Sequence, residues 1–200
     1  MGLFSFLNFL KADKNQKVEF DPNEYVPSFW EDDYCQIEIV PAENRYFIKK
    51  QSQQIDELAS KSRTDYGFGE TFERGPMPVT TRSKEFRVNF FEKTLTDFKF
   101  QKARHIRYNK SEILNCESGK TKAFGFSNFT IFFDTDDEFV KNIWVDIGLI
   151  VSVPQLDLIQ DTLYTLGEEC ELVLIDWNTL SLYDLAYKSQ IQDYLMWHFK

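Results

Sequence analysis

Cysteine and histidine are scarce in this 200-residue chain. The three cysteines, Cys35, Cys116 and Cys170, are widely spaced and form no CxxC pair, and neither His105 nor His198 lies beside one of them in the sequence. An odd number of scattered thiols is typical of buried free cysteines in a reducing compartment, and a disulfide framework fits them less well. The ligand spacing of a zinc site is also missing. The sequence therefore predicts a cytoplasmic location and no bound metal.

Long hydrophobic runs are missing too, because no segment reaches the roughly 18 apolar residues of a membrane span. The N-terminal apolar run ends at Leu10, with no basic residue before it and no small-residue cleavage site after it, so we expect no signal peptide. Phe6 stands where a myristoylation signal needs serine or threonine. Since Phe4, Leu7 and Leu10 share one helical face, residues 1–20 are predicted to hold a short amphipathic helix and a polar lead-in.

Glycine-rich phosphate loops and nucleophile motifs are absent as well. The Gly67-Phe68-Gly69 segment lacks the third glycine of a dinucleotide-binding fingerprint, and no GxxxxGK[ST] or GxSxG sequence occurs. An enzyme that uses carboxylates, or a pair of Cys116 with His105, stays open because catalytic groups meet in space rather than in sequence. No local oxyanion donor or orienting acid supports the Cys–His pair. We therefore expect no cofactor and no catalysis.

Aromatic residues are abundant, with 20 Phe, 9 Tyr and 4 Trp beside a hydrophobic content of 42%. Each buried aromatic side chain removes a large apolar area from water, so the chain can form a substantial core. Residues 21–200 are predicted to be one domain, although the glycine- and proline-containing segment 64–83 leaves an internal boundary open.

Hydrophobic periodicity predicts an α+β fold with a largely antiparallel sheet and three to four packed helices. Helices are expected at 42–62, at 154–166 with Gly167 as the stop signal, and near the C-terminus with Ser189 as the cap. Alternating or apolar runs predict the strands, which are 34–40, 86–90, 98–100, 106–108, 124–133, 142–153, 170–177 and a turn at Asn178 leading into 180–185.

Charge is distributed unevenly along the chain. Residues 111–200 hold 15 Asp/Glu against 5 Lys/Arg, whereas residues 1–110 hold 17 against 18, so the net charge of −9 belongs almost wholly to the C-terminal part. A negative field repels nucleic acid and anionic membranes, and it attracts basic proteins at rates that salt reduces. The plainer interpretation is an acidic surface with no particular partner. The more specific interpretation is that the protein binds a protein partner with a basic surface and binds neither nucleic acid nor membrane.

The densest acidic cluster runs from Asp134 to Glu138 between two predicted strands. A calcium loop would need glycine and glutamate at its sixth and twelfth positions, which are Phe139 and Val145 here. The cluster is therefore either a solvated hairpin turn or an acidic knuckle that binds a partner. Acid–base chemistry by paired carboxylates would require that they face each other in a cleft. The candidate partner-binding residues in this cluster are Asp134, Asp136, Asp137 and Glu138.

A second group of acids surrounds the last predicted hairpin, where Trp177 follows Asp176. An aromatic anchor with an acidic rim suits recognition of a basic protein surface, although a tryptophan that ends a strand also suits the edge of a core. The candidate partner-binding residues in this group are Glu168, Glu169, Glu171, Asp176, Trp177 and Asp184.

Residues 82–110 have the opposite charge, with nine Lys/Arg against three acids. Bases alternate with aromatic residues in the stretch Phe98–Lys110, a mixture that can contact phosphates and stack on bases. A nucleic-acid or regulatory binding module is therefore the alternative function. The interpretation we favour pairs these bases with the acidic C-terminal elements of the same molecule.

The run from Phe129 to Leu195 (FTIFFDTDDEF…WVDIGLIVSVP…LYTLGEECELVLIDWNTLSLYDLAYKSQIQDYL) resembles small bacterial immunity proteins encoded beside polymorphic toxins, including those of type VI and contact-dependent secretion. The resemblance covers the C-terminal third and lies in its acidic, aromatic-rich strand–helix–strand–hairpin–helix style and the VLIDWN strand end, and it fixes no functional residue. It implies a cytoplasmic protein that neutralises one cognate toxin domain without catalysis, by occluding or distorting an active site with a basic surface.

Overall fold

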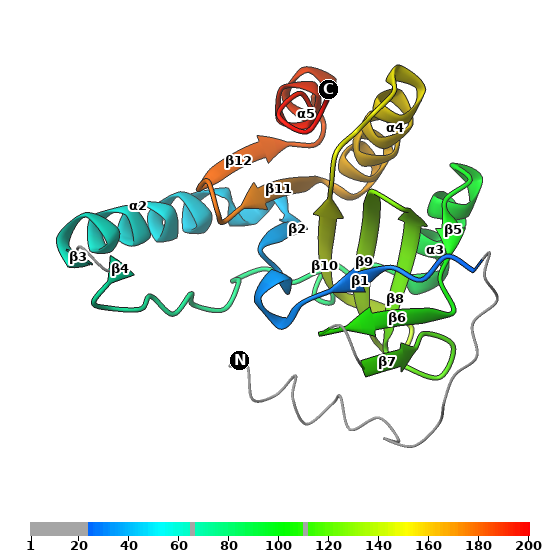
Figure 1. The fold of residues 1–200 in the computed structure, drawn as a ribbon, viewed down its shortest axis with the longest axis horizontal. Helices are drawn as coiled ribbons and strands as arrows, with labels where there is room; N and C mark the ends of the chain where they lie inside the picture. The colour runs from blue at the N-terminus through cyan, green and yellow to red at the C-terminus, as the bar shows by residue number, and fades with distance from the viewer. Residues whose placement is uncertain (1–23, 65–66, 110–111) are drawn as a thin grey trace.

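The computed structural model describes residues 24–64, 67–109 and 112–200, so the helix predicted within residues 1–20 lies outside the described residues. Its largest element is a seven-stranded sheet made of β2 (Ile37–Pro41), β5 (Gln101–Lys102), β8 (Thr121–Phe126), β9 (Phe129–Asp136), β10 (Phe139–Ile147), β11 (Leu172–Asp176) and β12 (Ser181–Asp184). The strands lie in the order β12-β11-β2-β10-β9-β8-β5 (Figure 1), and every neighbouring pair is antiparallel.

Two small sheets accompany the large one. The first holds β1 (Ser28–Phe29), β6 (His105–Tyr108) and β7 (Glu112–Asn115), and β1 is parallel to β6. The second is a two-stranded pair of β3 (Arg63–Thr64) and β4 (Gly67–Phe68). The helices are α2 (Arg45–Ser62), α3 (Val88–Asp97), α4 (Val153–Cys170) and α5 (Lys188–Leu195), with short 3₁₀ turns η1 (Glu31–Asp33) and η2 (Ala42–Asn44).

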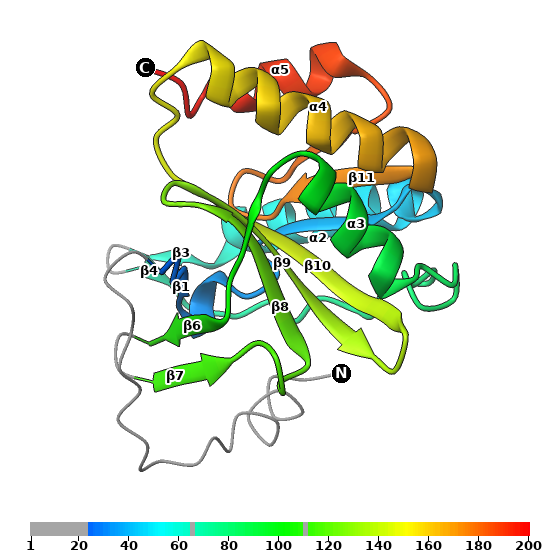
Figure 2. The same cartoon turned by 90° about the vertical axis from the view of Figure 1, so that its right-hand side faces the viewer.

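The two faces of the large sheet are covered by different elements (Figures 1 and 2). Side chains of β9 alternate between them, so that Phe129, Ile131 and Phe133 join a core with α3, α4 and α5. On the other face, Phe132 packs with the sheet of β1, β6 and β7, while α2 covers β2 and β11. The result is a three-layer α+β fold, which confirms the predicted fold class.

Segment 64–83 does not separate two independent sheets. Strand β2, which precedes this segment, lies between β11 and β10, which follow it. The segment is also fastened to the body, since the Asn44 side chain exchanges two hydrogen bonds with the backbone of Val79 (2.7 and 3.0 Å). The Thr81 hydroxyl donates to the Val140 carbonyl at 2.8 Å. Elements on both sides of 64–83 therefore share one sheet.

Residues 86–90 form no strand, so that prediction was wrong. Helix α3 begins at Val88, and its buried side chains are Phe91, Thr94 and Leu95. The spacing of three and four residues is helical, whereas the alternation of Phe86, Val88 and Phe90 extends over only five residues and fits either structure. The segment is helical because this places both Phe91 and Leu95 in the core against the large sheet.

The strand predicted at 124–133 is two strands, because Ser127 and Asn128 form a tight turn between β8 and β9. Strand β10 starts at Phe139 and ends at Ile147, so residues 148–153 of the predicted strand 142–153 lie beyond it. The acidic run does separate two paired strands, as predicted, and the turn itself is formed by Asp137 and Glu138.

Two predicted helix signals have other roles. Gly167 lies inside α4, which continues to Cys170, and a Cβ atom at Gly167 would collide with the backbone of Leu185. The glycine therefore permits close packing of the chain after β12 against α4 and does not stop the helix. Ser189 lies inside α5, whose N-cap position is Tyr187 and has no side-chain cap.

Candidate protein-binding surface

The predicted acidic knuckle does not project as one cluster. Asp134 points into the interior, where it accepts hydrogen bonds from the Tyr34 hydroxyl (2.7 Å), the Asn142 amide (3.1 Å) and the Thr121 hydroxyl (2.8 Å). Asp134 therefore contributes nothing to an exposed surface, contrary to the prediction, because alternation along β9 directs it to the sheet face beneath Tyr34.

The other acids of this run lie at the surface, and two of them meet cations of the same chain. Asp136 forms an ion pair with Arg82, and Glu138 forms one with Arg87. Asp137 is exposed at the turn with a positive φ of 55°. Two of the four acids of this run that were predicted to meet a partner are thus paired with cations of the same chain.

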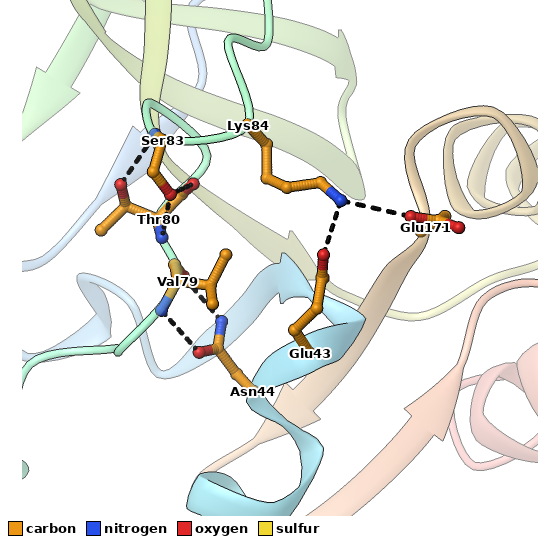
Figure 3. Close-up of polar contacts among 7 residues, drawn as sticks. All are labelled: Glu43, Asn44, Val79, Thr80, Ser83, Lys84 and Glu171. Atoms are coloured by element: carbon orange, nitrogen blue, oxygen red, sulfur yellow. Dashed lines mark hydrogen bonds and ion pairs between the residues drawn. The ribbon is translucent and has the colours of Figure 1, made fainter.

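The second acidic group is dispersed in the same way. Lys84 bridges Glu43 (2.5 Å) and Glu171 (3.2 Å), as Figure 3 shows, so this lysine joins the start of α2 to the end of α4. Asp184 pairs with Arg45 at 2.5 Å. Asp176 is buried and accepts the backbone N–H of Asn178, Glu168 accepts the Tyr164 hydroxyl, and Glu169 is exposed.

Trp177 is 7% exposed and belongs to the core under α2, so the prediction of an exposed aromatic anchor at this position was wrong. Its indole N–H donates to the Glu38 carboxylate at 3.2 Å, and the Arg74 guanidinium lies 4.8 Å from the ring centre. The reason is its place after β11, where the chain runs beneath the segment that carries Arg74.

The basic segment 82–110 supplies several of the cations that meet these acids. Besides Arg82, Lys84 and Arg87, the bases Lys93 and Lys102 form ion pairs with carboxylates of α3. Pairing within the molecule is the interpretation that the sequence favoured. It leaves less of this segment available to phosphates.

The cysteines are buried free thiols, as expected. Burial raises the pKa of Cys116 to about 12, so this thiol stays protonated at neutral pH and is a poor nucleophile. His105 binds Glu24 instead, with 2.7 Å between Nδ1 and Oε1. No three His, Cys, Asp or Glu side chains within 24–64, 67–109 and 112–200 gather in the arrangement of a metal site.

One pocket stands out on the sheet face that carries β1. Its volume is about 540 Å³, and its lining includes Glu24, Tyr25 and Phe126. Two lining residues, Thr130 on β9 and Asp146 on β10, are paired, and Gly125 on β8 pairs with Thr130 from the other side. The Tyr25 hydroxyl lies 2.6 Å from the Thr130 hydroxyl. A Cβ atom at Gly125 would come within 2.6 Å of the Tyr25 hydroxyl, so glycine makes room for the tyrosine.

The pocket and its surroundings are acidic. Asp146 is exposed at the pocket, where partial desolvation and, secondly, the nearby charge of Asp33 raise the pKa of its carboxyl. Asp33 belongs to η1, which follows the half-exposed Trp30 with three consecutive acids, Glu31, Asp32 and Asp33. Among the described residues, Asp146 forms no ion pair with a lysine or arginine. An exposed aromatic residue followed directly by acids thus occurs in this protein, far in sequence from the predicted one.

An exposed apolar surface lies next to the pocket. The backbone of Ile150 exchanges hydrogen bonds with His198 (2.8 Å) and Lys200 (3.2 Å), and this brings the loop after β10 beside the end of the chain. Trp197, at that end, is 85% exposed. We call the exposed apolar side chains of this loop, of the first residue of α4 and of the chain after α5 the apolar patch, and they are Leu149, Val151, Val153, Met196 and Trp197.

The turn between β8 and β9 joins the pocket to the apolar patch. Ser127 lines the pocket, and the next residue, Asn128, donates to the Leu149 carbonyl. Gln155 in α4 donates to the Asn128 side chain at 2.7 Å. The turn between β8 and β9 therefore lies between the pocket and the loop that carries Leu149.

Sequence analysis missed this surface for different reasons in its two parts. The run Trp30–Asp33 is an aromatic residue followed by three acids. These three acids are few beside the 15 Asp/Glu of residues 111–200, so the sequence drew attention to the C-terminal part. Leu149, Val151 and Val153 lie within the strand that the sequence predicted at 142–153, so they were not considered as a surface. Only the tertiary structure shows that nothing in the described chain covers them.

None of the helices in the described parts of the chain has both the length and the apolar composition that a membrane span requires. No protein-family model, curated protein or solved structure matches the chain.

Proposed function

We propose that this protein binds another protein through the apolar patch and, by doing so, neutralises a cognate bacterial toxin in the cytoplasm, as an immunity protein does. The observation that carries the proposal is Trp197, which is 85% exposed within a set of exposed apolar side chains. Contiguous exposed apolar surface is costly in water and marks sites of protein association. Tryptophan is also enriched among the residues that dominate binding energy.

Charge around the apolar patch suits a basic partner. Asp157 on α4 and Asp193 on α5 lie near it, are exposed, and form no ion pair within the described residues, while Lys200 adds one opposing charge. The net charge of −9 would speed the encounter with a cationic toxin domain, and salt would slow it. The apolar patch would then set the lifetime of the complex. Neutralisation by occlusion of a basic active site needs no catalysis.

The test is co-expression with the polypeptide encoded by the neighbouring gene. The proposal expects that the two proteins purify as a complex and that toxin activity falls to zero at a fixed molar ratio. A neighbouring polypeptide that is harmless to cells, or one that never binds this chain, would overturn the assignment.

A second candidate is an enzyme, and the pocket is the observation that favours it. Glu24 and Asp146 line one cavity, and partial desolvation raises the pKa of Asp146, an arrangement that acid–base chemistry can use. The same titration separates the two functions. An inhibitor neutralises its toxin stoichiometrically, whereas an enzyme protects at far less than one molecule per molecule of toxin.

A nucleic-acid-binding module has less support. Five bases of segment 82–110 form ion pairs with carboxylates of the same chain, namely Arg82, Lys84, Arg87, Lys93 and Lys102. The exposed residues Lys99, Arg104 and Arg107 are the remaining described bases of the segment. We expect no binding to single-stranded DNA or RNA at low salt, where an electrostatic interaction would be strongest.

A further inference from the structure

We infer that the pocket accepts one arginine side chain from the same protein that covers the apolar patch. This inference rests on the proposed function and identifies what the partner must carry, namely a guanidinium group beside an apolar contact surface. It starts from the shape, the lining and the position of the cavity.

The cavity has the size and lining of a binding site. About 540 Å³ lies within the range of ligand pockets, and this volume exceeds what a single ordered water occupies. Most of its lining residues are polar or charged, and the others are the apolar residues Val26 and Pro27 and the aromatic residues Tyr25 and Phe126. The polar residues of the lining are Glu24, Ser28, Gln101, Ser127, Thr130 and Asp146.

The ionisable groups of the pocket favour a cation. Glu24 and Asp146 are its acidic residues, and Asp33 lies close enough to Asp146 to disfavour the ionised carboxylate. His105 faces Glu24 from β6, and Arg107 on the same strand is exposed and forms no ion pair with a described carboxylate. Asp146 is exposed to solvent and forms no ion pair with a lysine or arginine of the described chain, so its carboxylate is accessible to a bound cation.

Arginine suits this lining better than lysine. A guanidinium is less strongly hydrated than an ammonium, donates two parallel hydrogen bonds to a carboxylate, and stacks on aromatic faces. The hydroxyl groups of Ser127 and Thr130 and the amide oxygen of Gln101 could accept its remaining N–H donors.

The position of the pocket connects it to the apolar patch. Asp146 and Leu149 are three residues apart at the end of β10, with the Asn128 turn between the two surfaces. A partner loop that places an apolar side chain against Trp197 could therefore reach the pocket with an adjacent arginine. Interfaces of this kind combine an apolar centre with a charged contact that sets orientation.

The experiment uses N-acetyl-arginine amide as the probe and two-dimensional NMR of the full chain as the readout. We expect saturable shifts of the Tyr25, Thr130 and Asp146 amide signals with a dissociation constant on the order of millimolar. The citrulline analogue, which has nearly the same shape without the charge, should produce none, and the lysine analogue should bind more weakly.

Variants test the carboxylate itself. Asp146→Asn should weaken binding of the probe at least fivefold, Asp146→Glu should retain most of it, and the matched change Asp157→Asn on α4 should have no effect. Unsaturable shifts, equal shifts with citrulline, or an unchanged response in Asp146→Asn would overturn the inference. The spectrum of each variant shows directly whether it is folded.

The complex with the neighbouring-gene polypeptide separates this inference from the proposed function. If Trp197→Ala breaks the complex and Asp146→Asn leaves its affinity unchanged, the protein binds as proposed but the pocket takes no arginine. If no complex forms with the wild-type chain, the proposed function fails, and the probe titration still reports on the pocket.

Discussion

Trp177 and Trp197 belong to two regions that use the same types of residue in opposite ways. Around Trp177, the indole meets Glu38, a guanidinium covers the ring, and the side chain is 7% exposed. Around Trp197, apolar side chains face solvent, and the carboxylate of Asp146 in the adjoining pocket has no cation of the described chain. The first region is completed by the fold itself. The second has no such contacts within the described chain, and under the proposed function a partner supplies them.

This difference changes what charge along a sequence can indicate. The C-terminal part carries nearly all of the net charge, yet folding brings Lys84 between Glu43 and Glu171 and places Arg82 beside Asp136. An excess of acid in a segment therefore does not become an acidic surface when another segment carries the matching bases. Under the proposed function, the acids available to a basic partner are those that folding leaves unmatched.

The interior region should respond most strongly to a change at Asp134. Asp134→Asn places an amide among three hydrogen-bond donors, so we expect the free energy of unfolding to fall by about 2 kcal/mol, the usual contribution of hydrogen bonds to a buried charge. The same change at exposed Asp137 should alter stability by less than about 0.5 kcal/mol. Urea denaturation measures both, and equal effects would show that burial does not distinguish the two acids.

A smaller and pH-dependent effect is expected at Glu38. Burial raises its pKa from 4.5, against the opposing influence of the Trp177 indole and Arg74, so folding disfavours the ionised carboxylate. Its contribution to stability is full below pH 4.5 and is lost as the pH rises through the pKa of the folded state. Glu38→Gln should therefore stabilise the protein more at pH 7 than at pH 4. Thermal unfolding at the two pH values measures this, and a constant difference between them would contradict it.

The sequence predicted the long, regular elements well. Helices α2 and α4 each have 18 residues, which is enough for the 3.6-residue period to be unambiguous. Helix α3 has ten residues and starts within a short alternating run, so its local pattern supported a strand. The turn at Ser127 and Asn128 was missed although serine and asparagine favour turns, because the aromatic residues on both sides resemble one continuous strand.

The candidate site could not be predicted to the same extent. Burial of Asp134 depends on which face of β9 it occupies, and a shift of one residue in the strand would have exposed it. The apolar patch depends on a contact between Ile150 and the end of the chain, which are far apart in sequence. Such contacts depend on the whole fold and cannot be predicted from residue types alone.

The most direct test of the binding surface is the affinity of Trp197→Ala for the neighbouring-gene polypeptide, measured by calorimetry. Tyr46→Ala is the matched control, because Tyr46 is 82% exposed on α2, which covers the other face of the sheet. We predict that Trp197→Ala weakens binding by about 30-fold or more, the effect of losing a dominant interface residue, while Tyr46→Ala changes it by less than about twofold. Wild-type affinity in a folded Trp197→Ala variant would contradict the account.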